Sequence, residues 1–359
     1  MKNWRKLTSI AVVMCMVLVL AACNSPAAEP PEPAPAPTQT PPAAPEGTAS
    51  EFDGAPTFEL KLSHAHPAGS GTDVGFNTLA EKIAEYTEGT VTATVYPGGS
   101  LIASNEAVEA LRNGTLDVAH ISSGDLATMI ATLNLLDVPG SYVLTNDDAY
   151  YMEFGSVLRE IIEPYGIQLL MPMPAVPSWF FSNKLNPRSP SDLQGLTVRS
   201  SGKYGGLAVE IWGGSPVTIT LADLPTAMER NTVDVVMSPG LGAYSNSWYE
   251  IQHHLTVTEI NTVMAMMAMS KQVFDQMTPA QQDALYRAAF DGCKAIFDFT
   301  MDEINFGMSV MSDYGNQIEE LTPEENAVFK ESLQPLRDQI VDEVGEEAAK
   351  LEAALQKIR

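Results

Sequence analysis

The sequence predicts an α/β protein with two similar lobes, and three observations support that class. Strand-like and helix-like segments alternate through the first part of the chain, an order typical of parallel sheets flanked by helices. A short pattern also recurs, since 110–118 reads ALRNGTLDV and 227–235 reads AMERNTVDV. Both copies are typical of a helix end, a Gly or Asn stop and a new strand, so each lobe is expected to hold one. The 359 residues, 45% of them hydrophobic, are enough for two domain cores.

The first lobe is expected to begin with a βαβαβ unit. Alternating hydrophobic residues predict strands at 58–62, 91–95 and 116–121, with helices between them. Gly89 and Gly114 are placed where these helices are expected to stop. This alternation predicts a parallel sheet with right-handed crossovers.

The chain is then expected to cross between the lobes twice. A strand-like run at 167–171 is followed by the proline-rich passage 172–177, which predicts the first crossing. Further strand-like runs lie at 255–260 and 262–269, and the second of these is expected to return the chain to the first lobe. Thr278 then begins a capping box with proline at the first helical position, which predicts a long helix.

Arg199 ends a short strand-like run and is the leading candidate for ligand binding. Its guanidinium is planar and permanently charged, so it can meet a carboxylate through two parallel hydrogen bonds. A salt bridge between domains explains this residue equally well, and both interpretations stay open. In open α/β sheets ligands lie beyond the carboxyl ends of the strands, so 120–123 and 237–240 are expected to face one crevice.

Aromatic and histidine side chains are further candidates for lining this cleft. Trp179 closely follows the first crossing, and it fits either a cleft floor or an ordinary core. His64 and His66 are separated by one residue, so on a strand they share a face. They fit a ligand cleft, ordinary packing or a metal ion, but no further Cys or His cluster supports a metal. We predict no metal site.

The glycines from Gly69 to Gly75 follow a strand and precede a helix, but they carry only a weak cofactor signal. Their spacing is not that of a dinucleotide-binding motif, and the acidic residue that such a motif needs is missing. We therefore predict no cofactor. A simpler expectation is that these glycines let backbone amides point at a ligand from a helix N-terminus.

Composition and missing motifs exclude several functions. The formal net charge is −25 and no basic stripe is visible, so nucleic acid is not an expected partner. The sequence contains no G-x-S-x-G elbow and no cysteine placed as a nucleophile, which leaves a hydrolase without support. We expect a binding protein and not an enzyme. Because the overall charge repels anions, affinity for an anionic ligand has to come from local groups such as Arg199.

The N-terminus carries the pattern of a bacterial secretion signal and a lipid attachment site. Basic residues precede an apolar run that ends at Ala22 and is too short to span a bilayer. The letters LAAC at 20–23 resemble the lipobox of bacterial lipoproteins, which predicts that Cys23 becomes the acylated first residue. The Pro- and Ala-rich stretch that follows favours an extended tether without a core. We expect an extracytoplasmic protein anchored to the cell membrane through Cys23.

Two stretches carry a resemblance to a known family: SPSDLQGLTVR, which ends at Arg199, and the later SPV and TAMERNTVDVV runs. They resemble the extracytoplasmic solute-binding proteins of TRAP transporters, the tripartite ATP-independent periplasmic family, and the resemblance covers about 57–345. Its most specific piece is D-L-x-G-L-x-V-R, and it implies that Arg199 binds a ligand carboxylate. Ser178 and Ser238 stand where many members have an arginine and an asparagine, so the clamp that the resemblance implies is incomplete, and we expect a monocarboxylate.

The resemblance implies a two-lobed, periplasmic-binding-protein-like fold in which a long helix spans both lobes and a small organic acid is held in the cleft. The implied partners are the small and large membrane subunits of a TRAP transporter driven by an ion gradient. The candidate ligand-binding residues are Arg199, Ser178, Trp179, Ser238, His64, His66, Ser122 and Tyr244. The expected division is 1–22 for the signal peptide, 23–56 for the lipid-anchored linker, 57–175 plus 262–303 for lobe I, 176–261 plus 304–345 for lobe II, and 346–359 for a C-terminal helix.

Two alternatives from the residues stay open. The same two-lobed design serves receptors of ATP-driven importers and of sensor kinases. A secreted enzyme or a surface adhesin on this scaffold is the second alternative, because a fold does not determine a function.

Overall fold

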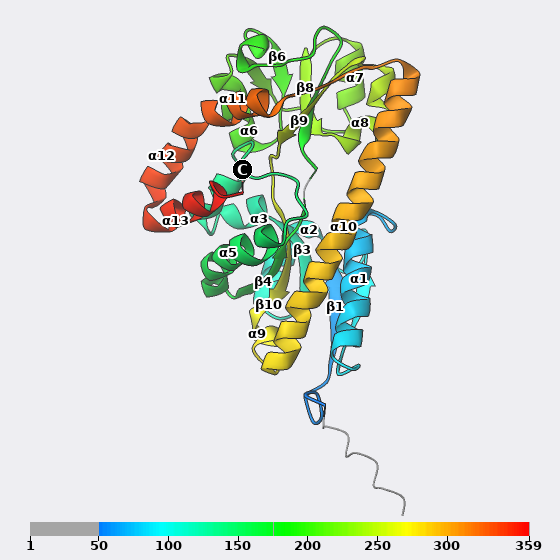
Figure 1. Cartoon of the computed structure of the whole chain (residues 1–359), viewed down its shortest axis with the longest axis vertical. Helices are drawn as coiled ribbons and strands as arrows, with labels where there is room; N and C mark the ends of the chain where they lie inside the picture. The colour runs from blue at the N-terminus through cyan, green and yellow to red at the C-terminus, as the bar shows by residue number, and fades with distance from the viewer. Residues whose placement is uncertain (1–49, 175, 359) are drawn as a thin grey trace, which may run out of the picture. The chain divides into compact units, whose positions relative to one another are not determined.

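A computed structural model of the protein describes residues 50–174 and 176–358, which form two β-sheets with surrounding helices (Figure 1). The first sheet has the strand order β2-β1-β3-β10-β4, and the second has the order β11-β9-β5-β8-β6-β7. The predicted signal peptide, the lipobox and most of the linker lie outside the described residues. None of the helices within the described ranges is long and apolar enough to cross a membrane.

The strands are β1 (Phe58–Ser63), β2 (Val91–Tyr96), β3 (Val118–Ser122), β4 (Ile167–Pro172), β5 (Ser178–Ser182), β6 (Thr197–Arg199), β7 (Ser215–Val217), β8 (Val235–Pro239), β9 (His254–Ile260), β10 (Ala265–Ser270) and β11 (Gln317–Glu320). The α-helices are α1 (Gly71–Tyr86), α2 (Ser104–Arg112), α3 (Ser123–Ala127), α4 (Asn134–Asp137), α5 (Gly155–Ile162), α6 (Gly202–Ile211), α7 (Leu224–Glu229), α8 (Leu241–Ser245), α9 (Lys271–Phe274), α10 (Pro279–Tyr314), α11 (Pro323–Ser332), α12 (Gln334–Val344) and α13 (Glu346–Leu355).

The two sheets share one topology. Strand β1 pairs in parallel with β2 and β3, and β6 pairs in parallel with β7 and β8. Strand β10 lies antiparallel between β3 and β4, and β5 lies antiparallel between β8 and β9. The series β2-β1-β3-β10-β4 therefore matches β7-β6-β8-β5-β9 strand for strand, and β11 is added at one edge.

The recurring sequence pattern folds in the same way in both lobes. The backbone amides of Thr115 and Thr232 each donate to a carbonyl of the preceding helix at 3.0 Å. Two residues later, the Asp117 carboxylate accepts from a backbone amide of β1 at 2.7 Å, and the Asp234 carboxylate accepts from one of β6 at 2.8 Å. Each T-x-D-V segment thus joins a helix end to a neighbouring parallel strand, which explains why these letters recur.

The purely parallel sheet expected from the alternation is correct for β2, β1 and β3 but wrong for the rest of the first sheet. Strand β10 enters antiparallel beside β3 because it arrives from the second sheet. The chain leaves the first sheet through the first crossing, 173–177, and returns through the second crossing, 261–264. Local sequence patterns reveal strands and turns, but they do not reveal where a strand inserts.

The C-terminal helices connect to both sheets. Helix α11 contacts β9, whereas α12 contacts α4 and α13 contacts α5. The Arg337 guanidinium of α12 donates to the Pro139 carbonyl at 3.0 Å. The assignment of 304–345 to lobe II, like the other domain boundaries, stays a prediction.

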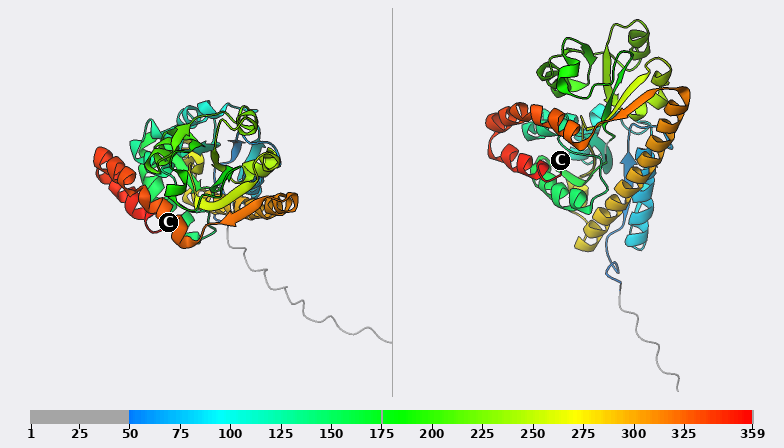
Figure 2. Two further views of the ribbon diagram at one scale, coloured as in Figure 1. Left: turned by 90° about the horizontal axis from the view of Figure 1, so that it is seen from above. Right: turned by 45° about the horizontal axis from the view of Figure 1, so that its top comes forward.

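Helices α1 and α10 lie side by side (Figures 1 and 2), and glycines permit this contact. A Cβ atom on Gly75 would lie 2.3 Å from the Ile296 side chain, and one on Gly292 would lie 2.6 Å from the Gly75 carbonyl oxygen. The capping box predicted at Thr278 opens α10, which reaches from α1 and β4 to α8. The expected long helix that spans both lobes is therefore confirmed. Gly75 lies inside α1 and serves this packing, which the sequence analysis missed.

We expect Gly292→Ala to lower the free energy of unfolding by about 1–3 kcal/mol, because a backbone carbonyl cannot move away cheaply from an added methyl group. Urea denaturation would measure it. The matched control is Gly206→Ala in α6, where the nearest atom to an added Cβ is 3.8 Å away. There alanine should be neutral or slightly stabilising, because it is the better helix former. Equal effects of the two changes would contradict the packing argument.

Candidate functional site

The carboxyl ends of β3 and β8 meet the two crossings. The Gly240 amide, just after β8, donates to a carbonyl of the first crossing at 3.0 Å. The Ser123 amide, just after β3, donates to the Met264 carbonyl of the second crossing at 2.8 Å. The two chain segments contact each other where the Ser178 and Thr262 hydroxyls lie 3.1 Å apart. Strand ends of both sheets are therefore gathered at the crossings, where open α/β sheets bind ligands.

Arg199 ends β6, and only 6% of its surface is exposed. Its Nε donates to the Ile219 carbonyl at 3.2 Å, and its Nη1 donates to the Met237 carbonyl at 3.3 Å. No carboxylate pairs with it within the described ranges, and burial lowers the pKa of the guanidinium. The two carbonyls orient the group and leave the Nη2 hydrogens for another acceptor. This arrangement favours an anion site over the salt bridge that the sequence left open.

Arg199, Ser238 and Trp179 lie on one face of the second sheet. Arg199 pairs with Val236, and Trp179 pairs with Ser238 two residues further along β8, so the strand alternation puts their side chains on the same side. Both Trp179 and Ser238 are buried. The Trp179 ring covers Gly240, because a Cβ atom there would lie 2.3 Å from it. The structure thus brings these three predicted site residues together.

Ser178, Ser122 and Tyr244 are engaged in contacts within the protein. Ser178 is bonded to the second crossing, as described above. The Ser122 hydroxyl caps α3 and donates to the Asp125 carboxylate at 2.7 Å. The Tyr244 ring packs edge-on against Phe306 of α10, with the centroids 5.4 Å apart. Their roles in ligand binding stay predictions.

His64 and His66 lie in a cluster with His120, which the sequence analysis had not named as a binding residue. The His66 and His120 ring centroids are 4.8 Å apart, and those of His64 and His66 are 6.5 Å apart. His64 Nε2 lies 3.1 Å from the Asp73 carboxylate. Burial, together with the neighbouring imidazoles, lowers the pKa of His120 to about 3. Partial burial of the ring, together with the neighbouring His64, lowers the pKa of His66. The sequence signal that could have identified His120 is its position in 120–123, the residues expected at the carboxyl end of a strand.

The glycine-rich turn before α1 does not offer its amides to a ligand as expected. The Gly69 amide donates to the Asp73 carboxylate at 2.8 Å, and the Asp73 amide donates to the Ser70 hydroxyl at 3.3 Å. The helix N-terminus is therefore capped by the protein itself, and that interpretation of the glycines was wrong.

A polar network ties the second crossing to the first sheet, and the sequence analysis missed it. The Ser123 hydroxyl donates to the Asp137 carboxylate at 2.5 Å and accepts from the Met264 amide at 3.1 Å. The Asn261 side chain donates to the Tyr142 carbonyl at 3.0 Å. Burial raises the pKa of Asp137 to about 6. No local motif marks these residues, because the contacts join distant segments.

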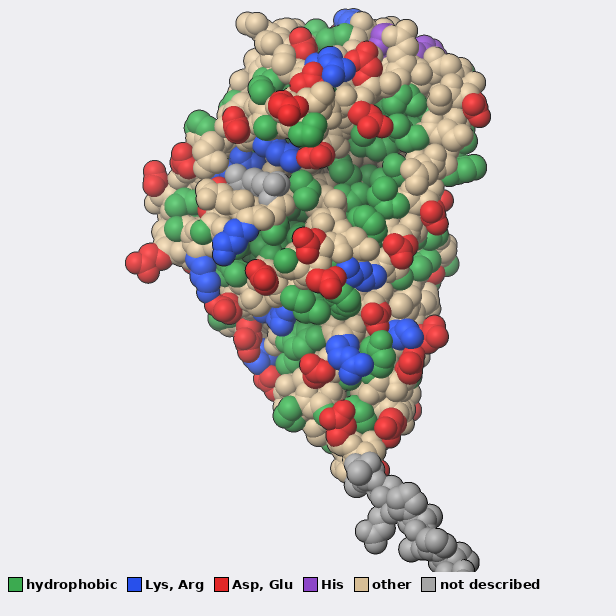
Figure 3. Space-filling view, in the orientation of Figure 1, with side chains coloured by type: hydrophobic (Ala, Val, Ile, Leu, Met, Phe, Trp, Pro, Cys, Tyr) green, Lys and Arg blue, Asp and Glu red, His purple; other side chains and the backbone are tan. Residues whose placement is uncertain are grey.

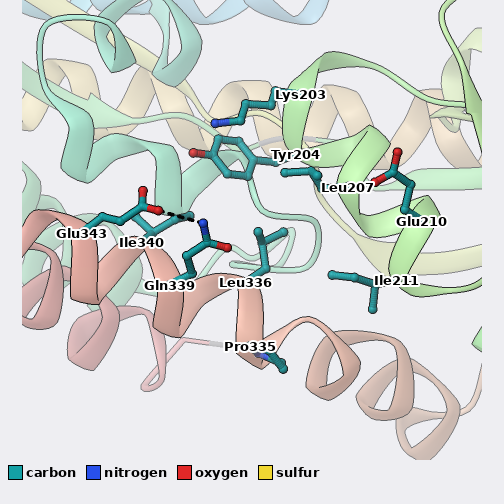
Figure 4. A pocket seen from close by; sticks show the side chains of 10 residues that line it. All are labelled: Lys203, Tyr204, Leu207, Glu210, Ile211, Pro335, Leu336, Gln339, Ile340 and Glu343. Atoms are coloured by element: carbon teal, nitrogen blue, oxygen red, sulfur yellow. Dashed lines mark hydrogen bonds between the residues drawn. The ribbon is translucent and has the colours of Figure 1, made fainter.

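Two pockets of about 550 Å³ do not have Arg199 among their lining residues. The first, between α6 and α12, is lined by Lys203, Tyr204 and Gln339 among others (Figure 4), and it includes none of the predicted site residues. The second lies beside α10 and includes Trp179 and Ile304. Hydrophobic side chains gather beside α10 on the face shown in Figure 3, and acidic side chains are spread over the same face. The first pocket has a cation in Lys203, but neither pocket has an arginine among its lining residues.

Metal binding has no support in the described ranges. No group of three or more His, Cys, Asp or Glu side chains there is placed to hold a metal ion. The three clustered imidazoles do not form such a group.

Comparisons with known proteins place the chain in a family. The model described as bacterial extracellular solute-binding protein, family 7, matches residues 62–343. The C4-dicarboxylate-binding periplasmic protein DctP of Rhodobacter capsulatus is 26% identical over 306 residues, which cover 80% of this chain and 88% of that protein.

Solved structures show the same fold. A TRAP periplasmic solute binding protein from Ochrobactrum anthropi has a TM-score of 0.77 at 22% identity, covering 85% of this chain and 96% of that one. A TRAP periplasmic solute binding protein from Sulfitobacter sp. NAS-14.1, solved with β-D-galacturonate, has a TM-score of 0.66 at 21% identity, covering 83% and 99%. The predicted two-lobed fold class is confirmed.

We expect Asp137→Asn to remove part of the pH dependence of stability. The pKa of Asp137 is about 6 in the folded protein against an ordinary value of 3.8, so the folded state binds this proton more tightly. Its contribution to stability is therefore full below pH 3.8 and is lost as the pH rises through 6. Between pH 5 and 7.5 the wild-type free energy of unfolding should fall by about 1 kcal/mol more than that of the variant. Parallel urea titrations at both pH values would measure this, and identical slopes would contradict it.

Proposed function

Because the chain belongs to family 7 of the bacterial extracellular solute-binding proteins, we propose that it is the solute receptor of a TRAP-type transporter. It binds a small organic acid between its lobes and delivers the acid to the small and large membrane subunits, which an ion gradient drives. The receptor itself carries out no catalysis. The dicarboxylate-binding relative and the galacturonate-bound neighbour support an acidic ligand.

The observation that carries this proposal is the buried guanidinium of Arg199. The chain has 45 acidic and 20 basic residues, so an acidic partner is the commonest neighbour available to a cation. Within the described residues Arg199 has carbonyl partners only. Burying an uncompensated charge costs several kcal/mol, and a ligand carboxylate would offset that cost. An aromatic ring and a serine share its sheet face, which suits a small carboxylate with an apolar or hydroxylated body.

Ligand binding would favour closure of the lobes. Arg199 belongs to the second sheet, and the histidine cluster lies at the strand ends of the first sheet. A ligand that contacts both binds the closed form more tightly, so it shifts the open-closed equilibrium by that difference in affinity. The crossings at 173–177 and 261–264 are the segments about which such a motion would turn.

A membrane anchor through Cys23 belongs to the same proposal. Its support is the LAAC motif at 20–23 and the Pro- and Ala-rich spacer that follows. Two or more acyl chains give stable attachment where one chain is marginal.

We expect Cys23→Ala to move the protein from the membrane fraction to the soluble fraction or to leave its signal uncleaved. Inhibition of lipoprotein processing should have the same effect. Cell fractionation with mass spectrometry of the processed N-terminus would measure both. Ligand affinity should not change, because a spacer separates anchor and receptor. A wild-type mature protein that carries an unmodified Cys23 would overturn the anchor.

We expect Arg199→Ala to leave folding intact and to weaken carboxylate binding by about 3–5 kcal/mol, because the ligand charge would be buried unpaired. Arg199→Lys should recover little, since lysine lacks the two-pronged geometry. Titration calorimetry with a panel of organic acids would measure the affinities.

The control for this experiment is Arg188→Ala, which removes a cation whose partners are Glu319 and Glu325. Thermal melting would report stability for every variant. An Arg199→Ala protein that binds as the wild type does, but melts several degrees lower, would make Arg199 structural and would remove the support for an anionic ligand.

A further inference from the structure

We propose that His66 and His120, positioned by His64, are specificity-determining residues that bind the uncharged end of the ligand through its hydroxyl or carbonyl groups. This inference rests on the proposed function, in which Arg199 binds the ligand carboxylate. It adds a second recognition element in the first lobe, which forms hydrogen bonds with uncharged groups where Arg199 binds a charged one. It also predicts that a ligand with a second carboxylate at this place binds less tightly.

The shared topology of the sheets puts the histidines at the place that corresponds to Arg199. Strand β1 holds the position of β6, and β3 holds that of β8. Leu62 pairs with Val118, and Val198 pairs with Val235, so Ser63 is the counterpart of Arg199. His64 follows Ser63 directly. The two lobes therefore present different chemistry at equivalent strand ends.

His64 is held rigidly and keeps one unused hydrogen-bonding atom. Its Nε2 faces the Asp73 carboxylate at 3.1 Å, which makes Nε2 the protonated nitrogen. Its ring packs edge-on against Phe76 with the centroids 5.1 Å apart, and only 2% of the residue is exposed. Nδ1 is buried and has no hydrogen-bond partner within the described residues. It is thus an acceptor that still requires a donor.

His66 and His120 are within reach of a ligand. His66 is exposed, His120 is half-buried, and their rings meet edge to face at 4.8 Å. Asp73 of α1 is a charged neighbour of the cluster, and it is bonded to His64. On the strand beside β3, the residue opposite His120 is the apolar Met267. Each neutral imidazole offers one donor and one acceptor, which is also the pattern of a hydroxyl group.

The alternative occupant of this position is a second carboxylate, and the lack of a compensating positive charge argues against it. A neutral imidazole can donate to a carboxylate, as His64 does to Asp73, but it brings no charge to offset repulsion. The pKa of His120 is lowered to about 3 by burial and by the two other imidazoles, so this cluster is a poor source of a cation. Asp73 and the net charge of −25 would repel the second carboxylate further. A neutral oxygen atom suffers neither penalty.

The test is titration calorimetry with three acids that share one carboxylate and differ elsewhere. Galacturonate adds hydroxyl groups, hexanoate adds only methylene groups, and succinate adds a second carboxylate. We expect the wild type to bind galacturonate most tightly. His66→Leu and His120→Phe should each weaken galacturonate binding by about 10- to 100-fold and leave hexanoate binding unchanged.

The control variant is His253→Leu, which removes an exposed histidine stacked on Tyr314 in the second lobe. It should change no affinity. If His120→Phe does not fold, His66→Leu still tests the proposal, because His66 lies on an exposed loop. Galacturonate binding should also take up no proton at pH 7, so its enthalpy should not depend on the ionisation enthalpy of the buffer.

The outcomes separate this inference from the proposed function. Affinity that falls in Arg199→Ala but not in either histidine variant would overturn the inference and leave the receptor standing. Tighter binding of succinate than of galacturonate, or uptake of about one proton, would assign the cluster to a second carboxylate and also overturn it. Failure of the wild type to bind any of the three acids would reject both.

Discussion

The contact between the start of β5 and the second crossing is the constraint on which the rest of the arrangement depends. Each crossing delivers one strand into the partner sheet, β5 beside β8 and β10 beside β3. Because both inserted strands begin at the carboxyl ends of their neighbours, the strand ends of the two sheets are gathered at the same place. Backbone hydrogen bonds from Ser123 and Gly240 hold each crossing to the strand end next to it. A binding site at this place would draw on residues of both sheets.

Much of the fold could be predicted because its signals are local. Strand alternation, glycine stops and the capping box at Thr278 each involve residues close in sequence, and the structure has these elements where they were expected. The antiparallel insertion of β10 and the roles of Gly75 and Gly292 depend on contacts between distant segments, so no local pattern contained them. The cap formed by Ser122 has a local signal too, since the letters SSGD at 122–125 carry a capping box.

The candidate site likewise contains residues that local sequence could reveal and residues that it could not. The position of Arg199 at a strand end was predictable from the glycine and the short β-run before it, but its carbonyl partners come from Ile219 and Met237 and needed the fold. His120 joins His66 only through the pairing of β1 with β3. Sequence reasoning therefore found residues whose position is set by the adjoining sequence. It missed residues whose position is set by pairing with another strand.

The electrostatics of the two lobes limit the choice of ligand. In a chain with a net charge of −25, every additional carboxylate on a ligand needs its own local cation. The second sheet supplies one in Arg199, whose carbonyl partners orient it without neutralising it. The first sheet supplies His66 and His120, whose pKa values are lowered by burial and by neighbouring imidazoles. In the proposed receptor, a cation of one lobe with carbonyl partners only, together with hydrogen-bonding imidazoles of the other lobe, would match an acid with one carboxylate and a polar, uncharged body.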